Sequence, residues 1–427
     1  MAVKKGYKQT EVGVIPEDWH EVRVNDLEPF ITSGSRGWAR YYSDRGELFI
    51  RITNMSRATI YLDLEDPRFV KLPTTSHEGA RTCVQNGDLL VSVTADIGII
   101  SWVSSTVPKP AYINQHIALV RLPLSQVDSK FTAYFLASSS PQKRFRAITD
   151  QGAKAGINLA TVRDIPLAFP PTLAEQEAIA GALSDADAWI ESLEQLIAKK
   201  RQIKQGAMQE LLTGKRRLPG FSGKWEKCSV GDVIEKAFCG PSPTCEERNI
   251  HGEEWGVLKT TAMTWEHGWD WTKHKRLPEH YWNQPEIEVH TGDVVVTKAG
   301  PRHRVGVAAF VNYVPDRILV SGKMIGLRPN TKRALGFMLA AAISAPSSQK
   351  FLDQRTTGMA ESQVNFENGV LIGTPICLPS ISEQHAIGST LSDMDAEIDS
   401  LESKLAKARE IKQGMMQELL TGKTRLI

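Results

Sequence analysis

The segment Glu175–Leu218, EQEAIAGALSDADAWIESLEQLIAKKRQIKQGAMQELLTGKRRL, recurs without a gap at Glu383–Leu426. At this offset of 208 residues, 30 of the 44 aligned positions are identical. A repeat at so long a period cannot be a solenoid of short units, so it indicates one plan carried twice, each copy with a whole globular domain. The repeated segment therefore sets the organisation of the chain.

Each copy of the repeat carries signals for the start and the end of a helix. A hydroxyl residue stands three positions before a glutamate, the spacing of a capping box in which both side chains satisfy backbone N–H groups. These pairs are Thr172 with Glu175 and Ser380 with Glu383. Gly214 and Gly422 can adopt the left-handed conformation that ends a helix. We therefore predict a central helix within residues 172–218 and a second helix within residues 380–427.

Apolar residues follow heptad spacing in both predicted helices, which forms a narrow stripe suited to a partner helix. We predict that the two helices form an antiparallel coiled coil; the alternative is that each packs on its own globular block. Gly206 and Gly414 interrupt the pattern, and either a close backbone approach or a bend would explain them. The predicted helix–helix interface comprises Leu183, Ile190, Leu193, Ile197, Leu211, Leu391, Ile398, Leu401, Leu405 and Leu419.

The two blocks that precede the helices, residues 1–171 and 219–379, share several landmarks. Strands are predicted at residues 88–94 and 293–298, where β-branched residues follow a glycine, and later strands at 118–122 and 324–328. Short helices are predicted at 130–137 and 334–343. The predicted fold class is α+β, with two similar α/β domains separated by two long antiparallel helices and related by a pseudo-two-fold axis. Outside these landmarks the blocks diverge, as expected for one frame with two binding specificities.

Composition describes an ordinary globular chain of 427 residues, with 41% hydrophobic and 23% charged residues. No apolar run approaches the roughly 20 residues that a membrane span needs, and the first residues lack the apolar core of a signal peptide. The 5 cysteines are scattered without a Cys-x-x-Cys pair, which favours reduced thiols in a cytoplasmic protein and argues against structural zinc. The net charge of +2 is too small to announce a nucleic-acid binder by itself.

In the first block, the loop at residues 33–42 is the main candidate for contact with a nucleic acid. Its glycines allow close backbone approach, and its arginines can neutralise phosphate or read guanine beside supporting aromatic rings. The alternative is a turn whose aromatic residues face the core. Asn114 and Gln115 can pair with adenine or can cap a strand, and Lys154 can contact phosphate. The candidates in the loop are Ser35, Arg36, Trp38, Arg40 and Tyr41.

In the second block, two basic stretches and one polar segment are candidates. The region from Trp255 to Trp282 holds five of the chain's ten tryptophans, most of them expected to pack, interleaved with lysines. The loop at 298–304 follows a strand and concentrates basic groups; the alternative is a solvated hairpin turn. Gln363 occupies the position that matches the glycine-rich segment of the first block. The candidates are Lys259, Lys273, Lys298, Arg302, His303, Arg304 and Gln363.

Three features together resemble the specificity subunit of type I restriction–modification enzymes, over essentially the whole chain. They are the two Leu-Leu-Thr-Gly-Lys helix ends, the Pro-x-x-x-Glu-Gln entries at 171–176 and 379–384, and the opening stretch from Gly6 to Trp19. The resemblance implies two target-recognition domains that each read half of a bipartite site in double-stranded DNA. It implies that the helices act as a spacer and help to dock two methyltransferase subunits. Motor-nuclease subunits would complete the complex.

The resemblance also implies that catalysis belongs to the partner subunits. S-adenosylmethionine, ATP and Mg²⁺ are then expected in those subunits, and no cofactor or metal in this chain. The residues agree: there is no Gly-x4-Gly-Lys-Ser/Thr phosphate loop and no Asn-Pro-Pro-Tyr or Asp-Pro-Pro-Tyr sequence, and His267, His274 and His280 lack a metal-binding spacing. Two other hypotheses are a helical scaffold that recruits proteins without reading DNA, and a self-contained DNA-modifying enzyme. The missing motifs disfavour the enzyme, and the diverged loops disfavour the scaffold.

Overall fold

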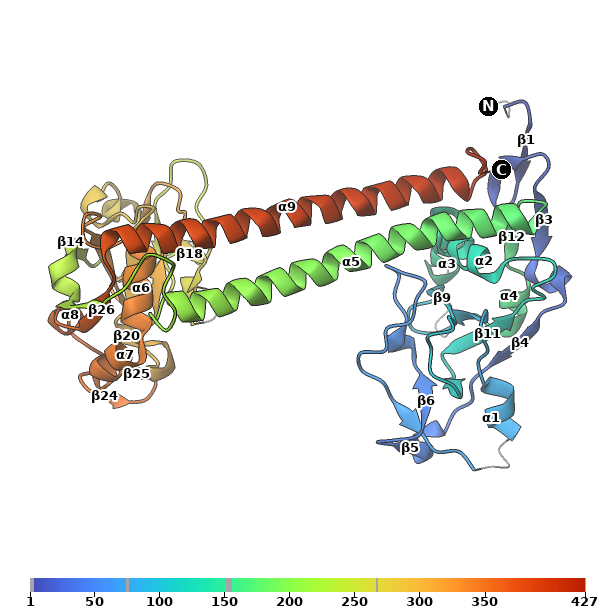
Figure 1. The fold of residues 1–427 in the computed structure, drawn as a ribbon, viewed down its shortest axis with the longest axis horizontal. Helices are drawn as coiled ribbons and strands as arrows, with labels where there is room; N and C mark the ends of the chain where they lie inside the picture. The colour runs from blue at the N-terminus through green and yellow to red at the C-terminus, as the bar shows by residue number, and fades with distance from the viewer. Residues whose placement is uncertain (1–3, 74–76, 151–155, 266–267, 427) are drawn as a thin grey trace. The chain divides into compact units, whose positions relative to one another are not determined.

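The protein is described from a computed structural model that covers residues 4–73, 77–150, 156–265 and 268–426. The chain forms two compact units. Unit 1 comprises Met1–Leu196 with Leu401–Ile427, and unit 2 comprises Ile197–Ser400. Each unit therefore combines one globular domain with one end of each long helix (Figure 1).

Domain 1, the globular part of unit 1, is built on two four-stranded sheets in the orders β4-β11-β8-β9 and β10-β6-β7-β5. Two antiparallel pairs, β1-β2 and β12-β3, complete it. Its elements are β1 Tyr7–Thr10, β2 Gly13–Pro16, β3 His20–Arg23, β4 Phe30–Ser33, β5 Tyr42–Ser43, β6 Glu47–Ile50, β7 Phe69–Val70, α1 His77–Thr82, β8 Leu89–Ser92, β9 Ile100–Trp102, β10 Ala111–Ile113, β11 Ile117–Arg121, α2 Ser129–Ala137, α3 Ser139–Asp150, α4 Leu159–Arg163 and β12 Pro166–Phe169.

Domain 2, the globular part of unit 2, repeats the antiparallel frame as the sheet β14-β23-β19-β21 and the pair β13-β26. It adds the sheets β18-β15-β22 and β20-β25-β24 and the hairpin β16-β17. Its elements are β13 Glu226–Ser229, β14 Ile234–Phe238, β15 Gly256–Leu258, β16 Met263–Thr264, β17 Gly268–Trp269, β18 His274–Arg276, β19 Val294–Thr297, β20 Ala299–Gly300, β21 Ala308–Phe310, β22 Ile318–Leu319, β23 Met324–Pro329, α6 Gly336–Ser344, α7 Pro346–Asp353, β24 Thr357–Ala360, β25 Gln363–Asn365, α8 Asn368–Ile372 and β26 Pro375–Leu378.

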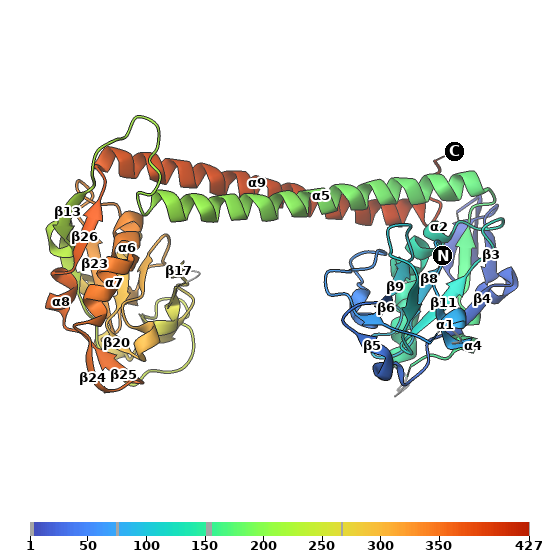
Figure 2. The same ribbon diagram turned by 60° about the horizontal axis from the view of Figure 1, so that its bottom comes forward.

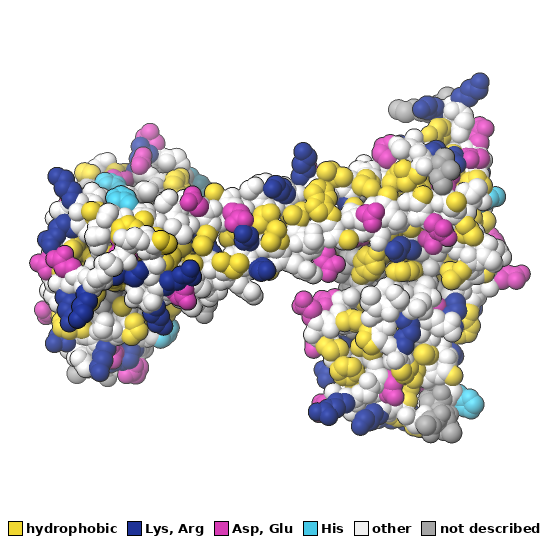
Figure 3. Space-filling view, in the orientation of Figure 1, with side chains coloured by type: hydrophobic (Ala, Val, Ile, Leu, Met, Phe, Trp, Pro, Cys, Tyr) yellow, Lys and Arg dark blue, Asp and Glu magenta, His cyan; other side chains and the backbone are white. Residues whose placement is uncertain are grey.

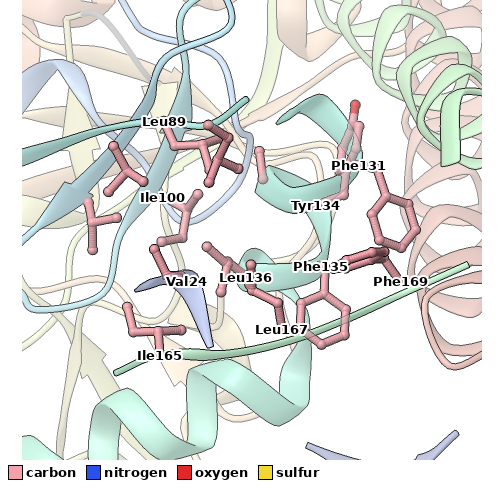
Figure 4. Packing of buried hydrophobic residues seen from close by; sticks show 14 of the residues in the cluster. Val24, Leu89, Ile100, Phe131, Tyr134, Phe135, Leu136, Ile165, Leu167 and Phe169 are labelled. Atoms are coloured by element: carbon pink, nitrogen blue, oxygen red, sulfur yellow. The ribbon is translucent and has the colours of Figure 1, made fainter. Parts of the chain in front are cut away.

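The landmark strands and short helices predicted from the sequence are confirmed as β8, β11, β19, β23, α2 and α6. In domain 1, the aromatic side chains of α2 pack against β12, as Figure 4 shows for Phe131, Phe135 and Phe169. All four residues of β8 are buried because that strand is central to its sheet. The core therefore lies between the antiparallel sheet and the helices that cover it.

The two domains share the same internal polar contacts as well as the same strands. Asp88 binds Arg121 at 2.7 Å in domain 1, and Asp293 binds Arg328 at 3.0 Å in domain 2. Both aspartate side chains are nearly inaccessible, at 1% and 3% exposed. Matching glutamine amides donate to glycine carbonyls, Gln142 to Gly98 and Gln349 to Gly306. A buried charge must be paired, so these contacts fix one frame in both domains.

The long helices are α5, Leu173–Leu211, and α9, Ile381–Leu419. The two helices run antiparallel within each unit, as one ion pair between them in each unit shows. Lys412 of α9 binds Asp187 of α5 in unit 1, and Lys200 of α5 binds Glu397 of α9 in unit 2. Three residues after the last residue of each helix stands a glycine with positive φ, +70° at Gly214 and +67° at Gly422. The predicted helix stops are confirmed, because only glycine adopts this conformation without strain. No helix of the described residues is long and apolar enough to cross a membrane.

Each helix begins differently from the predicted capping box. The backbone N–H of Glu175 donates to the Thr172 hydroxyl at 3.3 Å, and that of Glu383 donates to the Ser380 hydroxyl at 3.4 Å. The glutamate carboxylates do not return to their own helix. Glu175 binds Arg425 at the end of α9, and Glu383 binds the corresponding arginine at the end of α5, at 2.6 and 2.5 Å. This corrects the reciprocal capping box, since a buried carboxylate gains more from a bidentate guanidinium than from one N–H.

Gly206 and Gly414 lie inside continuous helices, and a Cβ added at either would meet nothing within 4 Å. Close backbone approach within a unit therefore does not explain them. The predicted interface residues divide into two sets. Leu183 and Leu419 belong to the core of domain 1, and Leu211 and Leu391 to the core of domain 2. The remaining residues lie along the middle of the helices, buried or half-buried: Ile190, Leu193, Ile197, Ile398, Leu401 and Leu405. The coiled coil stays a prediction.

Candidate nucleic-acid interface

A basic and aromatic surface surrounds β5 and β7 of domain 1, and we call it the domain 1 cation cluster. Tyr42 of β5 pairs with Val70 of β7, which brings the loops on both sides together. The Arg40 guanidinium lies 4.8 Å from the Tyr41 ring, and the Arg68 guanidinium lies 5.6 Å from the Tyr42 ring. Aromatic rings that support arginines in this way leave the guanidinium N–H groups free for phosphate or a base edge. The cluster comprises Arg36, Arg40, Arg45, Arg68 and Lys71.

This cluster lies at the end of domain 1 away from α5 in both ribbon views, where Figure 3 shows Lys and Arg side chains on the surface. Arg36 and Arg40 are exposed, and no carboxylate among the described residues binds either one. Arg81 stabilises the preceding turn, donating to the Ser35 hydroxyl at 2.9 Å and to the Ser33 carbonyl at 2.6 Å. The predicted loop thus presents free cations from a backbone that is held in place.

Two predicted contact residues of domain 1 have structural roles instead. Trp38 is 2% exposed, stacks on Phe49 with ring centroids 4.9 Å apart, and donates its indole N–H to Glu78 at 3.1 Å. Asn114 is 8% exposed, and its side-chain oxygen accepts the backbone N–H of His116 at 3.0 Å. In this fold Trp38 is a core residue, and Asn114 has the capping role that the sequence left open; contact of either residue with DNA stays a prediction.

The neighbouring candidates of domain 1 differ in what the structure says of them. Gln115 is half-buried, and its amide nitrogen lies 3.1 Å from the imidazole of His116. Tyr41 is half-buried; its ring lies nearly perpendicular to the Trp38 ring, with centroids 6.3 Å apart, and the Arg40 guanidinium lies 4.8 Å from its centroid. Lys154 lies outside the described residues.

In domain 2, the predicted tryptophan-rich ridge is neutralised by its own acids. Lys259 and Lys275 both bind Glu247, Arg276 binds Glu254, and Lys273 lies 3.9 Å from Asp270. Hydrogen bonds from the Arg248 guanidinium, and to a smaller extent from the backbone N–H of His251, hold the pKa of the Glu254 carboxyl well below its usual value. Lys259 is therefore engaged by a carboxylate at 3.1 Å, whereas Lys273 is 55% exposed and has only the longer contact. Sequence alone could not show this, because Glu246, Glu247 and Glu254 precede the lysines in a separate loop.

The basic loop after β19 separates into paired and unpaired cations. Arg302 binds Asp353 at 2.7 Å and Glu361 at 2.9 Å, and these carboxylates raise the pKa of its guanidinium. Lys298 faces an amide and a thiol instead, with its ammonium 3.1 Å from Asn368 Oδ1 and 3.6 Å from Cys239 Sγ. Among the described residues, Arg304 has no carboxylate partner. His303 is exposed, and its carbonyl accepts the Trp265 indole N–H at 2.9 Å.

The histidines of this region do not gather into a metal site in the described part of the chain. No group of three or more His, Cys, Asp or Glu residues there could hold a metal ion. His274 is 2% exposed and uses both ring nitrogens, one 2.9 Å from the Trp271 carbonyl and one accepting the Ile250 N–H at 3.1 Å. It is a structural histidine. His267 lies outside the described residues, and His280 packs on Tyr281 with ring centroids 4.2 Å apart.

Several surface residues beside the predicted candidates carry little signal in the sequence. Arg68 and Lys71 flank β7, whose two apolar residues are too few to signal a strand. In domain 2, Asn365 and Asn368 accompany Gln363, and all three are exposed. The alternation of buried Val364 and Phe366 with these polar residues was a usable signal, since it marks a half-buried strand.

The architecture is that of a two-domain DNA-recognition protein in which a duplicated frame carries different surfaces. The model of the type I restriction modification DNA specificity domain matches the chain twice, at residues 16–205 and 222–410. The chain therefore belongs to the type I restriction–modification specificity family. Members of that family are DNA-recognition subunits rather than catalytic ones.

Individual relatives agree with this assignment. The EcoEI specificity subunit of Escherichia coli is 33% identical over 187 residues, which is 44% of this chain and 31% of that protein. The putative MjaX specificity subunit of Methanocaldococcus jannaschii is 24% identical over 438 residues, covering 99% of this chain and 97% of that protein. The match to EcoEI thus spans about a third of its length, whereas the match to MjaX spans nearly all of it.

Solved structures show the same fold. The S subunit of a type I restriction–modification system from M. genitalium superposes with a TM-score of 0.50 at 15% identity, covering 98% of both chains. The HsdS subunit of Thermoanaerobacter tengcongensis superposes with a TM-score of 0.51 at 15% identity, covering 96% of this chain and 98% of that one. The prediction of two mixed α/β domains joined by long helices is confirmed.

Proposed function

We propose that this chain reads a bipartite site in duplex DNA, one half with each domain, and brings partner methyltransferase subunits to it. The observation that carries the proposal is the contrast inside the duplicated frame. The buried Asp–Arg and Gln–Gly contacts are the same in both domains, whereas the exposed surfaces differ. Domain 1 offers free arginines beside tyrosines, and domain 2 offers amides beside a few free cations. One frame with two surfaces suits two different base sequences.

Exposed residues that are identical on the two long helices support the proposal that two copies of one partner bind this chain. Gln205 and Gln209 of α5 are exposed, and their counterparts Gln413 and Gln417 of α9 are exposed as well. Packing does not require identical residues at exposed positions, and the domains have diverged elsewhere. The same partner surface presented on both helices accounts for the identity, and fits two copies of one methyltransferase subunit.

The chemistry then belongs to the partners. Transfer of a methyl group from S-adenosylmethionine falls to the methyltransferase subunits, and the use of ATP and Mg²⁺ falls to motor-nuclease subunits. The complex would act in the cytoplasm, where bacterial and archaeal DNA lies. A scaffold without DNA recognition is the competing function, and the free cations of the domain 1 cation cluster disfavour it.

Reconstitution tests the proposal. The purified chain is mixed with duplex DNA and radiolabelled S-adenosylmethionine, with and without a type I methyltransferase subunit from the same host. We expect no methyl transfer by the chain alone and site-specific transfer by the mixture. Methylation by the chain alone would show that it is an enzyme. Transfer by the mixture without sequence preference would favour the scaffold.

A further inference from the structure

The segment from β24 to β25 forms a hairpin ribbon on domain 2, and β20 pairs with its base at Val364 and Asn365 to make the three-stranded sheet β20-β25-β24. The strands pair antiparallel, with Thr357 opposite Asn365 and Ala360 opposite Gln363, so the turn between them has two residues. In Figures 1 and 2 the ribbon lies at the end of unit 2 away from α9. Because β20 pairs only with Val364 and Asn365, the tip of the ribbon from Ala360 to Gln363 is two-stranded, and a two-stranded ribbon has the dimensions that the major groove of B-DNA admits.

The ribbon has one buried face and one exposed face that is polar. Val364 and Phe366 are 3% exposed and pack inward, whereas Gln363 and Asn365 are exposed. Alternate residues of a strand point to the same side, so the two amides share the outer face. They stand about 6.6 Å apart along the strand, close to the roughly 6.8 Å of two base-pair steps at 3.4 Å each.

The amide groups are available and are held in place. The Thr357 hydroxyl donates to Asn365 Oδ1 at 3.4 Å, and no acceptor for the amide N–H groups of that side chain is found among the described residues. No side-chain partner of Gln363 is found among the described residues. Asparagine and glutamine amides match the N7 acceptor and N6 donor of adenine, a pairing that specifies the base.

The rest of the domain fixes the ribbon against its base. Arg302 donates its backbone N–H to the Glu361 carbonyl at 2.9 Å and binds the carboxylate of the same residue, which stands in the ribbon turn. A second ion pair to Asp353 anchors Arg302 to α7. Gly358 permits the close crossing of the strands, since a Cβ there would lie 2.5 Å from the Gln363 carbonyl oxygen. Arg302 therefore positions the ribbon.

Cations without an acidic partner border the ribbon. Lys298 precedes β20, the strand that pairs with β25, and Arg355 stands two residues before β24. Arg355 lies 3.7 Å from the Phe351 ring, and neither it nor Lys298 binds a carboxylate among the described residues. Cations on both sides of a polar ribbon suit the phosphates that line both sides of a groove.

We infer that the β24–β25 ribbon enters the major groove of the half-site read by domain 2, and that Gln363 and Asn365 read adenine-containing base pairs there. This inference rests on the proposed function and assigns the reading element within domain 2. The ribbon is favoured over the tryptophan-rich ridge as the main reader, because Lys259, Lys275 and Arg276 of the ridge are already bound to glutamates.

The test compares three variants of the chain in complex with its methyltransferase partner: Gln363→Ala, Asn365→Ala and the control Lys332→Ala. Lys332 is exposed in the same domain and stands outside the ribbon. Two measurements are made at fixed salt. The first is methylome sequencing of a host that carries each variant. The second is fluorescence anisotropy with duplexes that carry each single-base substitution in the site.

We expect Gln363→Ala to lose discrimination at one position of one half-site, and Asn365→Ala at a second position about two base pairs away. The loss should be roughly 5- to 150-fold at each position, the discrimination of one bidentate pair. The other half-site and the affinity for unrelated DNA should stay unchanged, as they should throughout in Lys332→Ala.

Two results would overturn the inference. In the first, both alanine variants keep full discrimination at every position. In the second, their affinity falls equally on all duplexes, which would make the ribbon a phosphate contact. Failure of the proposed function looks different, because the wild-type complex would then prefer no duplex over another.

Discussion

The contact between domain and helices differs between the two units. In unit 1, Tyr134 of α2 donates to Asp187 of α5 at 2.7 Å, and Asp187 binds Lys412 of α9 with both charged side chains about one-tenth exposed. Burial, together with the nearby Asp187 carboxylate, holds the pKa of the Tyr134 hydroxyl far above its usual value, so it remains a donor. One tyrosine thus joins domain 1 to both helices.

Unit 2 has the same ion pair without the tyrosine. The repeat aligns Asp187 with Asp395 and Lys412 with Lys204, which bind each other with side chains 53% and 25% exposed. Helix α6 has nine residues like α2, and its sixth residue is Ala341 where α2 has Tyr134. Duplication therefore preserved the helix pair and the frame of each domain. The contact between the domain and the long helices diverged, as the exposed surfaces did.

Exchange of a domain tests this separation most strongly. Replacing residues 219–379 by the corresponding domain of another family member should change one half of the methylated site completely and leave the other half unchanged. The reason is that each domain has its own core and frame. Methylome sequencing of a host with the chimera measures it. If both half-sites change together, the domains do not read independently.

Lengthening the helices should alter the spacing but not the sequences that are read. One heptad is inserted between Leu196 and Ile197 of α5, with a matching heptad between Ser400 and Leu401 of α9. This leaves the pair of Glu194 with Arg409 within unit 1 and the pair of Lys200 with Glu397 within unit 2. It adds about 10 Å of helix, near three base pairs at 3.4 Å each. We expect a longer unspecified spacer, or no methylation if the DNA cannot twist to compensate. An unchanged spacer with full activity would show that the helices are not a ruler.

The paired helix ends should be among the most sensitive points for stability. Arg217→Ala and Arg425→Ala each strand a buried carboxylate, Glu383 at 1% and Glu175 at 3% exposed. Removing one partner of a buried pair costs about 3–5 kcal/mol. Urea unfolding measures this against Arg409→Ala, which removes a pair whose side chains are 59% and 46% exposed. If all three variants lose similar stability, the helix-end pairs do not anchor the units.

The two attachments should differ by a smaller amount. Tyr134→Phe removes a hydrogen bond to a buried charge and should cost about 1–3 kcal/mol. Breaking the exposed counterpart with Asp395→Asn should cost below about 1 kcal/mol. Thermal unfolding of both variants measures which substitution lowers stability more, and we expect the larger loss from Tyr134→Phe in unit 1. The reverse order would mean that the tyrosine network contributes little.

The smallest expected effect is a response to acid in unit 2. Arg248 holds the pKa of Glu254 well below its ordinary value of 4.5, so the stabilisation is present above that value and is lost as pH falls below it. Glu254→Gln removes the titrating charge. The unfolding midpoint of this variant should therefore fall less than that of the wild type between pH 5 and pH 3, by scanning fluorimetry. Equal falls would show that Glu254 does not contribute to the acid response.

The candidate site was predictable only in part. The sequence indicates the loop around Arg36 and Arg40, because glycines and arginines concentrate there, and the structure leaves both arginines exposed. It does not indicate that Trp38 fills the core or that Lys259 is neutralised by Glu247, since each depends on a partner distant in the chain. Exposure and ion pairing are properties of folded neighbours, so residue type alone cannot supply them.

The duplication, the two long helices and the glycines that follow them can be predicted from the sequence alone, because periodicity and capping act between residues a few positions apart. The sequence also determined the shared strands of the two domains. The partners of Glu175 and Glu383 emerge only in the folded chain, since each binds an arginine in the segment that follows the other helix. These contacts join segments up to 250 residues apart. Such choices follow from which carboxylates are buried together with which cations once both helices are in place.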